Sequence, residues 1–245
     1  MTPTTGFRAF SLEPFPDIKE GASITDAITG VLADQNTSLE HGDVLVIASK
    51  AVSVSEGRYV ALDSVTPGEE ALDLSARTGK PAEVVQLILD ESTDHFLATE
   101  RGPIIARHRL GYQLTSAGVD RAGTDGAWLL PADPDASARR LRDELTTATG
   151  VEVAVVIADS DGRADRRGST VIAIGAAGIS PLRVSEHPED DGSIKRQQET
   201  LVDLAAAAAG IILGQRGRGA PVVVLRGMSY EAADAGVSSI LHRRP

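Results

Sequence analysis

Asp159 is the acidic residue of this sequence that is best placed for chemistry. It directly follows an apolar, mostly β-branched run at 151–158, and Ser160, Asp161 and Gly162 come next. A carboxylate at the end of a buried strand, beside a hydroxyl group and a glycine turn, can hold a divalent cation, because Mg²⁺ and Mn²⁺ prefer hard oxygen ligands. A turn aspartate that caps the loop is an equally good interpretation of Asp159 taken alone.

Three arginines follow this carboxylate, namely Arg163, Arg166 and Arg167. A guanidinium group beside a metal-binding carboxylate suits phosphoryl transfer, because it offsets the charge that develops on the phosphoryl oxygens. Arg163 and Arg166 are therefore candidates for contacts with a phosphate or a carboxylate. A solvated loop in which arginine pairs with aspartate is the alternative.

A glycine-rich segment at 214–219, Gly-Gln-Arg-Gly-Arg-Gly, lies between an expected helix and an expected strand. Glycines allow the backbone to approach phosphates closely, and the arginines add positive charge. The segment is not a Walker A sequence, and no G-x-G-x-x-G joins a strand to a helix, so neither common nucleotide fold is indicated. A glycine-rich surface turn is the alternative.

The remaining polar candidates carry weaker signals. Asp120 lies in a loop of small residues at 116–120, and taken alone it is more typical of a turn. The five histidines are scattered without metal-ligand spacing, so we expect most of them at the surface. No G-x-S-x-G elbow or other nucleophile motif is present.

Short apolar runs predict the elements that position these residues. Strands are expected at 43–49, 103–107, 127–130, 151–158, 171–174 and 221–225. Helices are expected at 24–32, 82–90, 136–146 and 201–213, the last one stopped by Gly214. Because strands and helices mix without a regular βαβ alternation, we expect the α+β class with a mixed sheet rather than a doubly wound Rossmann sheet.

Composition sets the limits on partners and location. A chain of 245 residues with 42% hydrophobic content can bury a substantial core, as a single domain of residues 1–245 or as two lobes. The formal net charge of −11 argues against nucleic acid or an anionic membrane as a partner. The absence of cysteine excludes disulfides, thiolate catalysis and Cys-ligated metals. Without a membrane-spanning run or a secretory signal, we expect a cytoplasmic protein.

Taken together and in order, these and other motifs resemble the coenzyme F420-0:L-glutamate ligases. The N-terminal signature matches at 42–50 and at Ser55-Glu56-Gly57-Arg58. Further matches follow at 117–120, 129–131, 133–138, 157–160, 162–163, 166, 173–179, 203, 213–215 and 221–227. They extend from about residue 15 to residue 227, which is nearly the whole chain.

The resemblance implies an intertwined α+β homodimer with a mixed-sheet ligase fold, which uses GTP with Mg²⁺ or Mn²⁺. Such an enzyme phosphorylates the terminal carboxylate of F420-0, a deazaflavin carrying a phospholactate tail, and L-glutamate then attacks the acyl phosphate to give an amide. The implied metal ligands are Asp120, Asp159, Ser160 and Gln215. The implied nucleotide contacts are Phe15, Pro16, Asp17, Ile18, Ser49, Leu213, Gly214, Gln215, Arg216 and Gly217, with the loop continuing to about Ala220.

Several positions depart from the family pattern. Val54 replaces the lysine of the S-K-x-E-G-R motif, and Gly123 replaces the asparagine of D-x-S-N. An apolar side chain cannot replace an ammonium group near phosphates, although Arg121 or Arg218 could compensate for Val54. The other departures are at Ala22, Ser23, Ser160, Asp161 and Asp165.

These departures leave several functions open beside the standard ligase. A divergent ligase of the same fold would use another acceptor, amine or nucleotide. A non-catalytic homologue would bind a phosphorylated ligand, and a metal-dependent phosphatase would use the aspartates to activate water.

Overall fold

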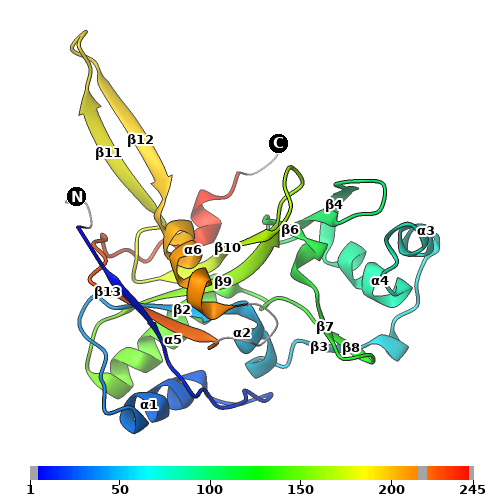
Figure 1. The fold of residues 1–245 in the computed structure, drawn as a ribbon, viewed down its shortest axis with the longest axis horizontal. Coiled ribbons are helices and arrows are strands. Elements are labelled where there is room, and N and C mark those ends of the chain that lie inside the picture. Colours follow the sequence, from blue (N-terminus) through cyan, green and yellow to red (C-terminus); the bar gives the residue numbers. More distant parts are fainter. Residues whose placement is uncertain (1–4, 215–219, 243–245) are drawn as a thin grey trace.

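A five-stranded mixed sheet lies at the centre of the structure, a computed structural model that describes residues 5–214 and 220–242 (Figure 1). Its strands in spatial order are β1 (Arg8–Ser11), β13 (Val222–Arg226), β2 (Val44–Ala48), β9 (Ala154–Gly162) and β10 (Ser169–Ala177). Strands β2 and β9 run parallel, and the other neighbours are antiparallel.

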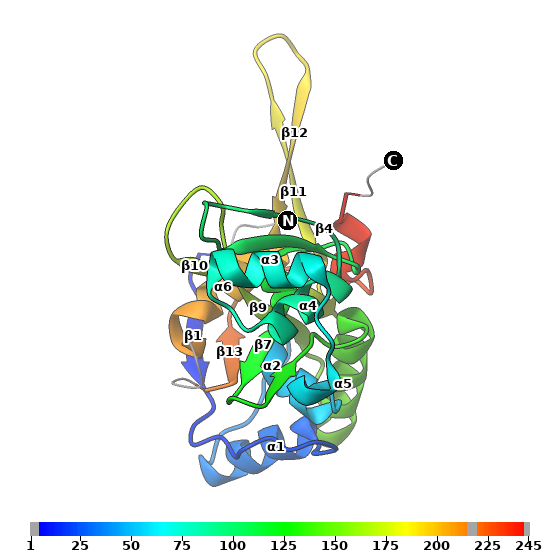
Figure 2. The same ribbon diagram turned by 90° about the vertical axis from the view of Figure 1, so that its right-hand side faces the viewer.

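Helices cover both faces of this sheet. Helix α5 (Pro134–Thr149) packs against β9 and β10 on one face, and α1 (Ile24–Asp34) packs against α5. Helix α6 (Leu201–Leu213) lies on the opposite face (Figures 1 and 2). Both faces of β2 and β9 are therefore buried, which explains why their sequences are continuous β-branched runs rather than alternating ones.

A second hydrophobic core lies beside the first and is built from smaller elements. It includes residues of α3 (Glu69–Thr78) and α4 (Ala82–Asp90). Two three-stranded sheets flank it, β3 (Tyr59–Ala61) with β8 (Gly126–Trp128) and β7 (Asp120–Ala122), and β4 (Ser92–Leu97) with β5 (Ile104–His108) and β6 (Gln113–Thr115). The other described helices are α2 (Ser49–Ser55) and three short 3₁₀ helices, Leu62–Ser64, Ser116–Gly118 and Val237–Ile240.

A long hairpin of β11 (Leu182–Pro188) and β12 (Ile194–Thr200) extends from the body of the protein (Figures 1 and 2). Within the described residues, no helix is both long and apolar enough to cross a bilayer.

The predicted α+β class with a mixed sheet is confirmed, but two local predictions were wrong. Asp159 does not follow its strand. It lies inside β9, which continues to Gly162 because β10 pairs with it, Ile172 lying opposite Asp159. Asp120 likewise lies in a strand rather than a loop, opposite Trp128.

One histidine is buried rather than at the surface. The side chain of His108 is 1% exposed, and its Nδ1 accepts a hydrogen bond from the Leu110 amide at 3.0 Å. Its Nε2 therefore carries the proton and donates to Glu91 Oε2 at 3.1 Å. Arg109 Nε donates to the same Glu91 oxygen at 3.0 Å. This cluster joins the end of α4 to the end of β5.

The Glu91 cluster predicts a loss of stability in acid. The His108 hydrogen bond, with a contribution from Arg109, lowers the pKa of Glu91 from its ordinary value of 4.5. The unfolded chain therefore binds more protons than the folded chain below that value, so the free energy of unfolding falls as the pH drops. We expect Glu91→Gln to flatten this fall between about pH 5 and about pH 3 in urea denaturation. The exposed control Glu100→Gln should keep the slope of the parent, and an equal slope in Glu91→Gln would contradict the prediction.

Candidate active site

A cavity of about 1280 Å³ is lined by residues from both hydrophobic cores. The central sheet contributes Ala48, at the end of β2, and its partner Ala158 within β9. The second core contributes Val84 and Val119. The N-terminal loop and the end of α6 also reach it. Segments from most of the length of the chain therefore meet at one place.

Most residues that the sequence marked as candidates line this cavity. They are Phe15, Pro16, Asp17, Ile18, Ser49, Asp120, Asp159, Ser160, Leu213 and Gly214. Gln215, Arg216 and Gly217 lie outside the described residues. The roles of all these residues in binding stay predictions.

Ser49 and Asp159 meet because their strands are parallel neighbours. Ala48 of β2 pairs with Ala158 of β9. Because the two strands run in the same direction, the residues that follow, Ser49 and Asp159, lie next to each other. Ser49 is buried and its hydroxyl donates to Asp159 Oδ1 at 2.7 Å. Burial raises the pKa of Asp159 to about 7, the charge of Asp120 adds to this, and the Ser49 hydrogen bond opposes it.

Asp120 approaches the same cavity from β7. Lys50 Nζ lies 3.9 Å from Asp120 Oδ2, and both side chains are about half exposed. Desolvation by the surrounding protein raises the pKa of Asp120, and the positive charge of Lys50 opposes that rise. The pKa values of both carboxyl groups are raised by burial, and a bound cation would stabilise their charged forms.

The chemistry of the donor groups fits Mg²⁺ or Mn²⁺. Asp120, Asp159 and Ser160 offer carboxylate and hydroxyl oxygens, the ligands that these cations prefer. In the described part of the chain, no cluster of three His, Cys, Asp or Glu residues could hold a metal. The predicted set would therefore depend on Ser160, on substrate oxygens and on Gln215.

The two arginines proposed from the sequence do not line the cavity. Arg163 and Arg166 are exposed between β9 and β10, and Arg166 Nη2 pairs with Asp165 Oδ2 at 2.9 Å. This geometry matches the alternative of a solvated loop with internal pairing. Among the described residues, the cations that line the cavity are Lys50, Lys80 and Arg121. Of these three, the sequence indicated only Arg121 as a possible source of charge.

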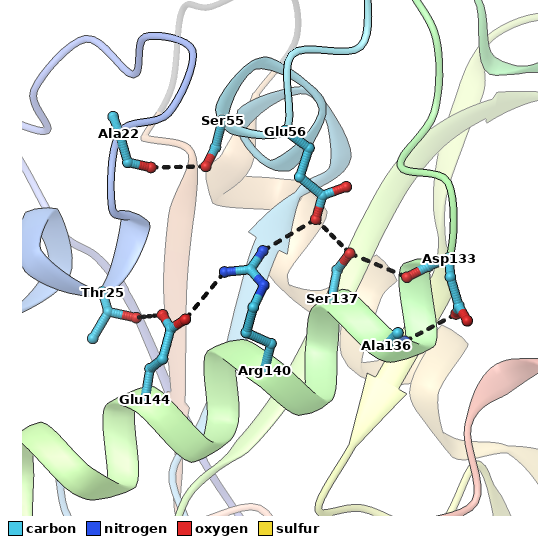
Figure 3. Close-up of polar contacts among 9 residues, drawn as sticks. All are labelled: Ala22, Thr25, Ser55, Glu56, Asp133, Ala136, Ser137, Arg140 and Glu144. Carbon is cyan, nitrogen blue, oxygen red and sulfur yellow. Dashed lines mark hydrogen bonds and ion pairs between the residues drawn. The ribbon is translucent and has the colours of Figure 1, made fainter.

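Glu56, the first residue of the Glu56-Gly57-Arg58 signature, lies at the C-terminal end of α2, the helix that begins at Ser49. Its contacts therefore position α2. Glu56 Oε1 accepts hydrogen bonds from Ser137 Oγ at 2.6 Å and from Arg140 Nη2 at 3.1 Å, both on α5 (Figure 3). Arg140 also bonds to Glu144, which accepts from Thr25 on α1 (Figure 3). The network fixes the end of α2 to two helices of the first core.

Removing this acceptor should loosen α2. We expect Glu56→Ala to lower the free energy of unfolding by about 1–3 kcal/mol, because Arg140 loses a charged acceptor and Ser137 loses the nearer of its two acceptors. Glu56→Gln keeps an acceptor oxygen of the same shape and should cost less. Urea denaturation midpoints of the two variants provide the measurement, and equal losses would show that the hydrogen bonds do not stabilise the fold.

The fold and the cavity define a mixed-sheet α+β protein in which carboxylates and cations share one site, and the comparisons place this protein among the ligases. Residues 14–227 match the family described as F420-0:Gamma-glutamyl ligase. The chain belongs to this family, which confirms the resemblance seen in its motifs.

Three relatives show how completely the chain is covered, and each is named Coenzyme F420:L-glutamate ligase. The protein from Methanothermobacter thermautotrophicus is 35% identical over 245 residues, 98% of this chain and 97% of its own length. The one from Archaeoglobus fulgidus is 35% identical over 224 residues, 90% of this chain and 87% of its own. The one from Methanopyrus kandleri is 36% identical over 236 residues, 92% of this chain and 90% of its own.

Proposed function

We propose that this protein is a coenzyme F420-0:L-glutamate ligase that uses GTP and a divalent metal ion. One observation carries the proposal: a chain that matches the family over residues 14–227 also gathers Asp120, Asp159 and the N-terminal loop around one cavity. The named relatives act on coenzyme F420 and L-glutamate according to their descriptions. We extend those substrates to this chain.

Asp120, Asp159 and Ser160 would hold Mg²⁺ or Mn²⁺, with Gln215 as a further ligand predicted from the sequence. When bound, the cation neutralises charge on the nucleotide phosphates. Ser49 holds Asp159 through the 2.7 Å hydrogen bond and so fixes the direction of the carboxylate. The nucleotide would lie against Phe15–Ile18 and the segment from Leu213 to Gly217.

The proposed reaction has two steps. The terminal carboxylate oxygen of F420-0 attacks the γ-phosphorus of GTP, the bond between the β,γ-bridging oxygen and that phosphorus breaks, and GDP leaves. The amine of L-glutamate then attacks the acyl carbon, the C–N bond forms, phosphate leaves with its oxygen, and the nitrogen loses its extra protons. The contribution of the protein is to position the reactants and to balance their charges.

A divergent ligase of the same fold is the second candidate. Val54 and Gly123 both line the cavity. The ammonium and amide groups that the family motifs have at these two positions are therefore absent from the site itself. A different acceptor, amine or nucleotide would suit that change.

We also propose a homodimer in the cytoplasm. The β11–β12 hairpin extends beyond the body (Figure 1). Ile194 on this hairpin is exposed, and so are Leu204 and Ile211 on α6. Leu204 and Ile211 are two helical turns apart and so share one apolar face that a second copy could cover. A cytoplasmic location would supply the GTP that the proposed reaction consumes. Light scattering of the purified protein at several concentrations tests the assembly.

The deciding experiment incubates the purified protein with F420-0, L-glutamate, GTP and Mn²⁺ or Mg²⁺, and follows the product by mass spectrometry. A glutamylated product with release of GDP is the expected result. No product, with GTP and metal still bound, would favour the divergent ligase. Neither product nor binding would overturn the proposal.

A further inference from the structure

Two cations in the cavity, Lys80 and Arg121, are left without a carboxylate partner. Lys50, the third cation of the lining, already interacts with Asp120 at 3.9 Å. Among the described residues, neither Lys80 nor Arg121 forms an ion pair with an acid, and the Arg121 guanidinium bonds only to the Gly123 carbonyl at 3.3 Å. The pair therefore has free positive charge that faces a cavity large enough for a nucleotide or a cofactor.

The backbone holds Lys80 firmly between two helices. Helix α3 ends at Gly79 in the left-handed conformation at φ 72°, and α4 begins after Pro81. Ser75 Oγ donates to the Lys80 carbonyl at 2.7 Å, which ties the residue back to α3. A lysine fixed in this way loses little further backbone entropy when it binds a ligand.

Lys80 and Arg121 line the same cavity, and the charge of Arg121 acts on Lys80. Burial lowers the pKa of Lys80, and the positive charge of Arg121 lowers it further. Both effects penalise a charged lysine, and a bound anion that contacts both side chains would oppose the second effect. Two nearby cations of this kind bind phosphate, which accepts several charge-assisted hydrogen bonds.

The valine at position 54 indicates what Lys80 and Arg121 do in this chain. Val54 lines the same cavity where the family motif has a lysine, so this chain lacks one cation there. We propose that Lys80 and Arg121 together bind a phosphate oxyanion of a substrate and supply the positive charge that Val54 does not. The inference rests on the proposed ligase function, whose substrates offer two such anions: the phosphates of GTP and the phosphodiester of F420-0.

The test uses Lys80→Met, Arg121→Gln and the double variant, with Arg101→Gln as a control for loss of an exposed arginine. Affinities for GTP with Mn²⁺ and for F420-0 are measured separately by calorimetry. We expect each single variant to lower the affinity for one of the two ligands about tenfold, the loss typical of one charged hydrogen bond. Lys80→Arg, which keeps the charge, should recover most of the loss.

The two affinity measurements show which substrate supplies the phosphate that Lys80 and Arg121 bind. Weaker GTP binding with unchanged F420-0 binding assigns the pair to the nucleotide, and the opposite result assigns it to the acceptor. Folded variants that bind both ligands as tightly as the parent would overturn the proposal.

A probe that needs no ligase activity separates this inference from the proposed function. Tripolyphosphate should raise the melting temperature of the parent protein and should not raise that of the double variant. If the parent forms no product with F420-0 but still shows this difference, the ligase proposal fails and the oxyanion pair stands. If tripolyphosphate stabilises the parent and the double variant equally, or neither of them, the pair is not a phosphate site.

Discussion

Asp159→Asn is expected to lower the rate of amide formation by more than ~100-fold, because even the loss of a group that only supports a metal ligand costs about 10–100-fold. The amide side chain keeps an oxygen that can accept the Ser49 hydrogen bond at 2.7 Å in the parent. It loses the negative charge that would hold the cation. The fold should therefore survive while Mn²⁺ binding, measured by calorimetry, weakens together with turnover.

Asp34→Asn is the matched control for this variant, because Asp34 is exposed at the end of α1 and does not line the cavity. It should keep the activity and the metal affinity of the parent. An Asp159→Asn protein with parental turnover would refute a metal-binding role for Asp159. A loss of activity in the control as well would mean that the assay reports on net charge instead.

Asp43→Asn is expected to destabilise the fold by about 3–5 kcal/mol, the range found when one partner of a buried ion pair is removed. Asp43 is 1% exposed and directly precedes β2. Arg226 at the end of β13 donates to both of its carboxylate oxygens, at 2.9 Å and 2.7 Å. The amide carries no charge and cannot accept both bonds, so among the described residues Arg226 keeps only Glu40, at 2.6 Å from its Nη1, as a carboxylate partner.

Urea denaturation of the Asp43→Asn protein measures this loss. Asp73→Asn provides the comparison, because Asp73 pairs with Arg77 at 3.5 Å on the exposed side of α3. That pair should contribute no more than about 1 kcal/mol. Similar losses in the two variants would show that burial of the Asp43 pair adds nothing to its strength.

The elements that the sequence predicted well are those whose pattern reflects burial. The runs at 43–49, 151–158 and 221–225 became β2, β9 and β13, and the helix expected at 82–90 is α4 with the same bounds. β-Branched residues with both faces covered, or apolar residues at helical spacing, leave little choice of structure.

The missed elements have sequences whose pattern does not reflect their structure. The β11–β12 hairpin is largely polar and exposed, so no alternation of apolar residues marks it. The segment Ser49–Ser55 carries β-branched valines but forms α2 directly after a strand. Tertiary packing overrides the local preference there.

The candidate site divides in the same way. Motifs led to Asp120, Asp159 and Ser49, which meet in the cavity, because their order along the chain matches a family. No motif in the sequence indicates Lys80, because a lysine between Gly79 and Pro81 is typical of a linker between two helices. Only the packing of the second core against the first brings it to the cavity wall.

The order of strands in the central sheet has a consequence for synthesis of the protein. Among the described strands, β1 pairs only with β13, which lies more than 200 residues later in the chain and separates β1 from β2. A growing chain therefore cannot place β1 until almost all of it has been made, and such distant pairings form slowly. The N-terminal loop that follows β1 forms part of the cavity wall. We expect the cavity to be completed only in the finished chain, so that truncated products do not sequester its substrates.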